Sequence, residues 1–117
     1  RPPVDTAALA RLAEAVPHSR VIVACANQAE IEKFLSAAPR DRCWADISFL
    51  KSPMFSVEYM TQRFGASRFL FGTHMPFLDP GATVMKLRMA AISETDREAI
   101  AWRNASAIWP QAATAVR

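Results

Sequence analysis

At 117 residues, the chain is long enough for one ordinary domain with its own core, and far short of the roughly 250 residues of a complete eight-stranded α/β barrel. Hydrophobic residues make up 51% of it and charged residues 21%, which is typical of a globular protein rather than a disordered one. The net charge of +3 comes from scattered basic residues, so we expect no nucleic-acid partner. No apolar run approaches the roughly 20 residues of a membrane span, and no signal-peptide pattern is present, so we expect a soluble, cytoplasmic protein without a membrane partner.

The first half of the chain predicts two helices and two strands. Residues 5–16 predict a helix with leucine, alanine and valine on one face. Residues 21–26 are apolar at every position, which is typical of a parallel strand covered on both faces, so we expect an interior strand here. Residues 27–38 predict a second helix that opens with a capping-box sequence. Residues 43–50 then alternate between two faces, one of which turns polar, and this polarity suits a strand that lines an opening.

The second half predicts three more helices and one more strand. A helix over residues 56–64 has Ser56 as its possible N-cap, and the third strand covers residues 69–73. Helices over residues 80–91 and 93–108 follow, each preceded by a capping residue. Helices thus alternate with three strands. This order predicts an α/β fold with parallel strands joined by right-handed crossovers, in a single domain over residues 1–117.

The third strand ends in His74, which is followed by turn-forming residues. Because substrates and catalytic groups meet at the C-terminal ends of parallel strands, a titratable side chain at this place suggests an active-site opening. The segment around it reads Phe64-Gly-Ala-Ser-Arg-Phe-Leu-Phe-Gly-Thr-His-Met-Pro76, followed by Phe77-Leu-Asp-Pro-Gly81. The sequence of this segment resembles the C-terminal part of metal-dependent hydrolases of the amidohydrolase-2 branch of the amidohydrolase superfamily. The resemblance covers most of residues 20–108.

The resemblance implies a partial (β/α)8 TIM barrel, made of about three parallel strands that alternate with helices as the C-terminal units of the barrel. It implies metal-assisted hydrolysis of a C–N or ester bond of a small-molecule substrate, or the decarboxylation that some relatives perform, with zinc or manganese as the divalent cofactor. Two departures concern the metal site. The family's aspartate after Gly-Thr is His74 here, and Cys25 stands where the family often has a histidine. The family's His-x-His pair is absent from the sequence.

Five residues are candidates for the site. His74 and Asp46 are the catalytic candidates, although His74 can also be a hydrogen-bonded structural histidine, and a carboxylate like Asp46 more often holds a strand end. Asn27 and Thr73 are candidate substrate contacts, and a helix-capping role is the alternative for Asn27. His74 and Cys25 are candidate metal ligands. The more common role of a cysteine like Cys25 is that of a small apolar core residue, and a role as ligand or nucleophile is less common.

A catalytic zinc ion generally needs three protein ligands, and Cys25, Asp46 and His74 form the one plausible set in this sequence. Because the two histidines lie 56 positions apart in the sequence and no carboxylate–histidine cluster is present, we expect the chain to bind no stoichiometric zinc or manganese. Since the family's principal ligands are missing, we also expect residues 1–117 alone to show no hydrolase activity. The alternative is a non-catalytic member of the family that binds a small molecule or forms a structural half-barrel. We also expect no disulfide between Cys25 and Cys43, which would lie about 13 Å apart along the strands.

The assembly expectation follows from the small number of strands. The chain starts at Arg1 rather than at a methionine, which suggests a fragment. Three strands covered by helices on the outside leave the inner sheet face open, with Val21, Val23, Leu70 and Trp44 directed inward. We therefore expect a homo-oligomer, or binding of the missing N-terminal half of the barrel, to cover this face.

Overall fold

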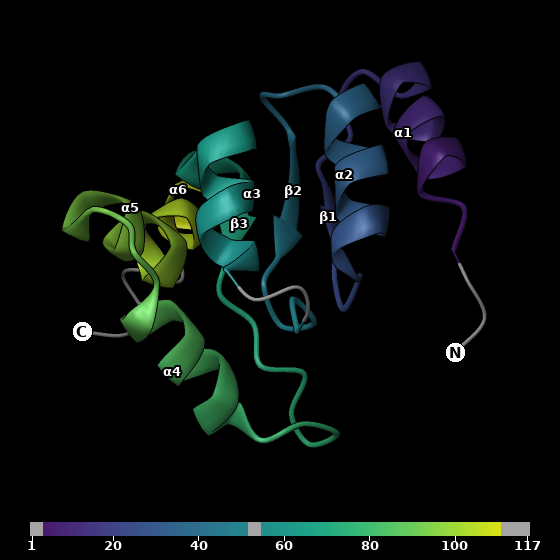
Figure 1. Ribbon diagram of the computed structural model, residues 1–117. Helices are drawn as coiled ribbons and strands as arrows, with labels where there is room; N and C mark the ends of the chain where they lie inside the picture. Colours follow the sequence, from purple (N-terminus) through teal and green to yellow (C-terminus); the bar gives the residue numbers. More distant parts are fainter. Residues whose placement is uncertain (1–3, 52–54, 111–117) are drawn as a thin grey trace.

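The computed structural model describes residues 4–51 and 55–110 (Figure 1). The first half contains the helices α1 (Thr6–Ala15) and α2 (Gln28–Ala37) and the strands β1 (Val21–Val23) and β2 (Cys43–Asp46). The second half contains α3 (Ser56–Phe64), the short 3-10 helix η1 (Ala66–Arg68), β3 (Phe69–Leu70) and α4 (Pro80–Met89). It closes with α5 (Glu94–Glu98), the π-helical turn η2 (Ala99–Arg103) and α6 (Asn104–Ile108), which follow one another directly over the region predicted as a single helix.

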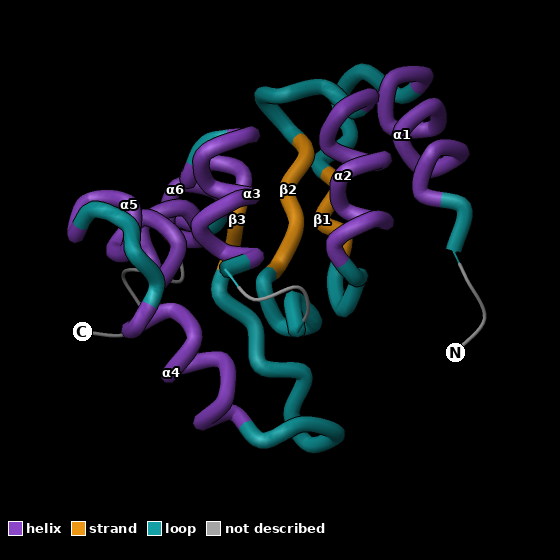
Figure 2. Tube along the Cα trace, viewed as in Figure 1, coloured by secondary structure: helices purple, strands orange, loops and turns teal. Residues whose placement is uncertain are grey.

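The three strands form one parallel sheet in the order β1-β2-β3 (Figure 2). This confirms the predicted α/β fold with three parallel strands, and the sheet stays open, as expected for part of a barrel. The strand over residues 21–26 is parallel to the next strand, as predicted, but its predicted interior position is wrong for this chain, because β2 is the middle strand and β1 pairs with β2 alone in the described sheet. The strand is also shorter than its apolar run. It ends at Val23, and two residues later Cys25 takes the left-handed conformation with φ 58°, which no strand can accommodate.

The register decides which side chains share a face of the sheet. Val23 pairs with Ala45, and Ala45 pairs with Phe69, so these three side chains point the same way and pack into the main core. Phe34 of α2 and Met60 of α3 are fully buried in the same core. The prediction that Val21 and Val23 face the inside of the barrel is therefore wrong, because both belong to the helix-covered face. The opposite face carries Ile22, Trp44, Asp46 and Leu70.

The helix boundaries follow capping chemistry in most cases. Side chains of Asp5, Asn27, Asp79 and Ser93 accept hydrogen bonds from main-chain N–H groups of α1, α2, α4 and α5. The predicted N-cap role of Ser56 is wrong. Ser56 is the first helical residue and is buried, while the preceding Phe55 is left-handed with φ 66° and provides no side-chain cap.

Helix α1, which packs against α2, buries its small side chains most completely, while Leu9 is partly buried against the core. Ala10 and Ala13 are each 1% exposed, whereas Leu12, which was predicted on the buried face, is 60% exposed. Small residues let the two helix backbones approach closely, and this rotates the larger apolar side chains outward. No helix within the described residues is long and apolar enough to cross a membrane.

The last helical segment covers the open edge of β3. The N–H of Ile47 donates to the Leu70 carbonyl, so the carbonyl of the preceding Phe69 points away from β2. The side-chain amide of Asn104 donates to this Phe69 carbonyl at 2.8 Å and to the Ala66 carbonyl at 2.7 Å. One of the two sheet edges is thus protected within the chain itself.

Candidate active site

Three candidate residues lie at or just beyond the C-terminal ends of the strands. Asp46 is the last residue of β2, Cys25 follows β1 by two residues, and His74 follows β3 by four. The three loops leave the sheet at the same end (Figure 2). Parallel strands make this convergence possible, because their C-terminal ends share one side of the sheet.

Asp46 joins two of these loops. Its Oδ1 atom accepts hydrogen bonds from the Cys25 N–H at 3.1 Å, the Ser48 hydroxyl at 2.8 Å and the Ser48 N–H at 3.3 Å. Ser48 is 1% exposed, so its hydroxyl needs such a partner. The carboxylate therefore fixes where the Cys25 backbone lies relative to β2.

Cys25 and His74 contact each other directly. The Cys25 Sγ atom lies 2.5 Å from His74 Nδ1, and the Ser48 hydroxyl reaches the same sulfur at 3.7 Å. Both residues are left-handed, with φ 58° at Cys25 and 56° at His74. Such a conformation is uncommon for residues other than glycine, and backbone outliers of this kind cluster at active sites and ligand contacts.

Aromatic rings hold the imidazole from two sides. The Phe49 ring stands edge-on to His74 with centroids 6.2 Å apart, and the Phe77 ring is tilted against it at 5.4 Å. His74 is half-buried, so one side of the ring remains accessible. The pair of Cys25 and His74 is thus confined in geometry but not sealed from solvent.

Gly72 gives the carboxylate its space. A Cβ atom at this position would lie 2.5 Å from Asp46 Oδ2, which is closer than real Cβ contacts, so only glycine fits beside the carboxylate without displacement. Ser48 and Gly72 were not singled out from the sequence. A glycine at the end of an apolar strand was the available signal for close approach, and the polar position two residues after Asp46 was the signal for Ser48.

The two predicted substrate contacts bond mainly to their own neighbours. Asn27 is exposed, its side chain accepts the Glu30 N–H at 3.0 Å, and its own N–H donates to the Glu30 carboxylate at 2.9 Å. The Thr73 hydroxyl accepts the Met75 N–H at 3.4 Å. Both residues lie in the strand-end loops, and their role toward a substrate stays a prediction.

The donor set does not fit a catalytic metal ion. Cys25 and His74 supply two donors in mutual contact, while one Asp46 oxygen accepts three hydrogen bonds from Cys25 and Ser48. Among the residues described, no three histidine, cysteine or acidic side chains are grouped so as to hold a metal ion. A catalytic zinc site generally needs three such ligands. Neither cysteine is part of a disulfide.

A lysine side chain also lies beside the strand ends. The Lys86 ammonium of α4 donates to the Ile47 carbonyl at 3.4 Å, just after β2. Burial lowers the pKa of Lys86, and the nearby Lys51 charge lowers it further, while Asp46 acts in the opposite direction. Lys86 was not predictable as a site residue, because the sequence of its helix carries no signal that directs this side chain toward the sheet.

Parallel strands that alternate with helices, with polar side chains gathered after their C-terminal ends, define this chain as part of an α/β barrel of the TIM type. Residues 1–111 match the family model described as Amidohydrolase, so the chain belongs to the amidohydrolase family. This family is in general metal-dependent and acts on small molecules. Comparison with curated proteins gave no match, and comparison with solved structures gave none either.

Proposed function

We propose that this chain belongs to a hydrolase of C–N or ester bonds in which Cys25 and His74, rather than metal ligands of this chain, carry the chemistry at the barrel opening. The direct contact between Cys25 Sγ and His74 Nδ1 is the observation that supports it. A thiol needs a neighbouring base to become a strong nucleophile, and an imidazole is the usual partner. Family membership supports hydrolysis as the reaction class.

The proposed reaction needs no further reactant than water. His74 Nδ1 accepts the Cys25 thiol proton, the sulfur attacks the substrate carbonyl carbon, and the C–N or C–O bond breaks as His74 returns the proton to the leaving group. Water then attacks the thioester and gives a proton to His74. The C–S bond breaks, and the proton returns to sulfur. Asp46 acts as a positioning residue, because it binds the Cys25 N–H and leaves the thiol directed at the imidazole.

The test uses chemistry that does not depend on turnover, since residues 1–117 alone are expected to show no hydrolase activity. Iodoacetamide should alkylate Cys25 in the folded chain, as read by mass spectrometry of its peptide, while the buried Cys43 stays unmodified. His74→Asn should slow this alkylation about a hundredfold, at the lower end of the range for removal of a general base. Asparagine suits the left-handed backbone at this position.

Two controls separate reactivity from folding. His18→Asn replaces the other, exposed histidine and should leave the alkylation rate unchanged. A nitrophenyl ester should acylate Cys25 in a burst of at most one equivalent per chain, and Cys25→Ser should lose the thioester product. Equal alkylation rates for wild type and His74→Asn, or a burst that does not depend on Cys25, contradict the proposal.

Metal analysis addresses the competing assignment of Cys25 and His74 as ligands. We expect the purified, dialysed chain to contain no stoichiometric zinc or manganese by elemental analysis. The double variant Cys25→His with His74→Asp carries the ligand types of the family and should bind more metal than the wild type. One metal ion per wild-type chain, lost in His74→Asn, would replace the thiol proposal with the ligand assignment.

A non-catalytic, small-molecule-binding member of the family is the second candidate. The observation that favours it is Asp46, whose oxygen is used in holding loops together rather than facing an opening. An unreactive Cys25 combined with specific ligand binding at the strand ends would support this candidate.

A further inference from the structure

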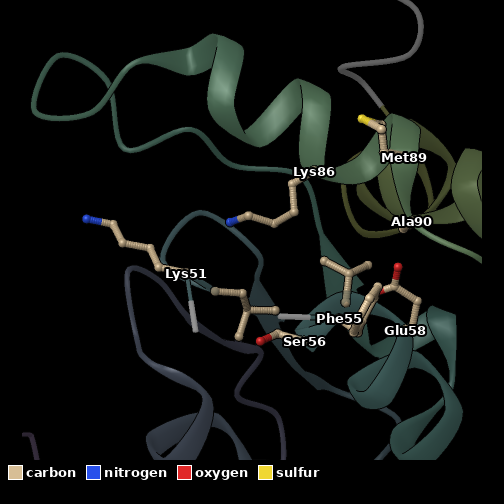
Figure 3. A pocket seen from close by; sticks show the side chains of 9 residues that line it. Lys51, Phe55, Ser56, Glu58, Lys86, Met89 and Ala90 are labelled. Atoms are coloured by element: carbon tan, nitrogen blue, oxygen red, sulfur yellow. The ribbon is translucent and has the colours of Figure 1, made fainter. Parts of the chain in front are cut away.

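A separate cavity lies beyond the end of β2, bounded by α3 and α4 (Figure 3). Its volume is about 310 Å³, at the lower end of the range for small-molecule sites. Leu50 and Val57 form part of its wall and are almost fully buried, whereas Phe55 and Met89 line it with 69% and 76% of their surface exposed. An apolar surface of this kind becomes favourable when a bound molecule covers it.

Two lysines give one side of this cavity its charge. Lys51 and Lys86 both line the cavity, and Figure 3 shows their amino groups on one side of the view and Glu58 on the other. The Glu58 carboxylate already accepts the Ala91 N–H at 2.9 Å. Among the described residues, no ion pair joins Glu58 to Lys51 or Lys86.

The surroundings of Lys86 disfavour its charged form, and a bound anion would stabilise that form. It is half-buried, and its pKa is lowered by burial first and by the Lys51 charge second. Asp46 is the group that favours its charged form, and the Ile47 carbonyl is its hydrogen-bond acceptor. An oxyanion placed between the two ammonium groups would offset their repulsion and replace part of the lost hydration of Lys86.

We propose that this cavity binds a small organic anion, with a carboxylate or phosphate at Lys86 and Lys51 and an apolar body against Phe55, Val57 and Met89. The two lysines act as point charges, so they attract either oxyanion without a fixed geometry. The size of the cavity fits a single aromatic ring or a short chain rather than a protein segment. This cavity adjoins the strand ends through Lys86 but is not lined by Cys25 or His74, and the proposal stands whether or not Cys25 reacts.

The test compares three probes of nearly the same body. Benzoate and phenyl phosphate carry the two oxyanions, and benzamide is the neutral match. Calorimetry or ligand-observed NMR on the full chain should show binding of at least one anion, and no comparable binding of benzamide. Affinity should fall when salt is added, because the attraction is electrostatic. The anion that binds more tightly shows whether the site prefers a carboxylate or a phosphate group.

Lysine variants locate the site. Lys86→Gln and Lys51→Gln should each weaken anion binding about tenfold, which corresponds to loss of one charge-assisted contact, and Lys86→Arg should retain most of the affinity. Lys33→Gln, on the exposed side of α2, should leave it unchanged. Circular dichroism checks that each variant is folded, and Lys51 is exposed enough that its replacement should not affect folding.

Three outcomes overturn the proposal. The first is that neither anion binds the folded wild type. The second is that benzamide binds as tightly as the anions. The third is that Lys51→Gln and Lys86→Gln both bind the anion like the wild type. Anion binding by Cys25→Ser should equal that of the wild type, which keeps this result independent of the proposed hydrolase chemistry.

Discussion

The two ends of the sheet are built from different chemistry. At the N-terminal end, an arginine stands directly before each strand, and each binds main-chain carbonyl groups: Arg20 that of Ile108, Arg42 those of Ala13, Val16 and Ser19, and Arg68 that of Cys43. At the C-terminal end, side chains contact side chains, with Cys25 against His74 and Ser48 against Asp46. The backbone there is left-handed at two residues.

This difference separates stability from function. A guanidinium that binds several carbonyls ties distant segments together and needs no further partner to be useful. A thiol beside an imidazole adds little to folding, and holding both in a left-handed backbone costs energy. In barrels of this type, stability is concentrated at the N-terminal face of the sheet and catalysis at the C-terminal face. Variants at the two ends should therefore change different measurements.

The largest expected effect is at Arg42. Its Nη1 atom lies 2.6 Å from the Ala13 carbonyl and within 3.1 Å of the Val16 and Ser19 carbonyls, at the C-terminal end of α1. Arg42→Ala removes this charged donor from the end of a helix and should lower the free energy of unfolding by about 3 kcal/mol. Denaturant unfolding measures this loss. Arg11→Ala, on the exposed side of α1, is the control and should change it by less than about 0.5 kcal/mol.

The same variant sharpens the comparison through Cys25. Under conditions where Arg42→Ala is still folded, the alkylation rate of Cys25 should equal that of the wild type. A clear change in rate would mean that the two ends are coupled and that the separation is wrong.

A smaller loss of stability is expected at Asp46. Asp46→Ala leaves the Cys25 N–H and the buried Ser48 hydroxyl without their acceptor, which should cost about 2 kcal/mol. Asp46→Asn keeps an acceptor oxygen and should cost about half as much. In contrast to Arg42→Ala, Asp46→Ala should change the alkylation rate of Cys25 and its pH profile. Unchanged alkylation in Asp46→Ala would reduce Asp46 to a purely structural residue.

The covered edge of β3 should contribute about 1 to 2 kcal/mol. Asn104→Ala removes both hydrogen bonds to the Ala66 and Phe69 carbonyls and leaves this edge open. Asn104→Asp is the matched control, because it keeps the shape but removes the donor. Both variants should lower stability to a similar extent, and a loss in Asn104→Ala alone would point to packing instead.

Assembly tests the other edge. No described strand pairs with the outer edge of β1, and Ile22 and Trp44 on the inner face are half-buried. Exposed apolar side chains and unpaired strand edges favour association. Sedimentation at micromolar concentration should therefore show an oligomer, and Asn104→Ala should increase its size. A stable, compact monomer would contradict this expectation.

The elements were more predictable from the sequence than the site was. Alternating helix and strand patterns fix the order of the elements, and local capping residues such as Asn27 and Asp79 fix where helices begin. The position of each strand within the sheet was not predictable. An all-apolar run like that of residues 21–26 indicates that the faces of the strand are covered, but it does not show on how many edges the strand pairs with a neighbour. The contact of Cys25 with His74 depends on two left-handed residues 49 positions apart, and no local pattern signals this.

The smallest expected effect appears in alkaline solution and comes from Cys43 at the protected end of β2. Burial raises the pKa of the Cys43 thiol, and Asp41 acts in the same direction, while Arg42 and Arg68 oppose both. The unfolded chain then loses this proton at lower pH than the folded chain, so the stability that Cys43 contributes is complete below about pH 9 and falls as pH rises above it. One such group changes the slope of stability against pH by at most about 1.4 kcal/mol per pH unit.

Cys43→Ala should remove this slope between about pH 8 and 10, and denaturant unfolding across that range compares the slopes rather than the absolute stabilities. Lys86, whose lowered pKa makes stability rise with pH, is present in both proteins and cancels in the difference. An identical slope of stability against pH in wild type and Cys43→Ala would contradict this prediction, because it would show that the Cys43 thiol is not shielded from solvent at the N-terminal end of β2.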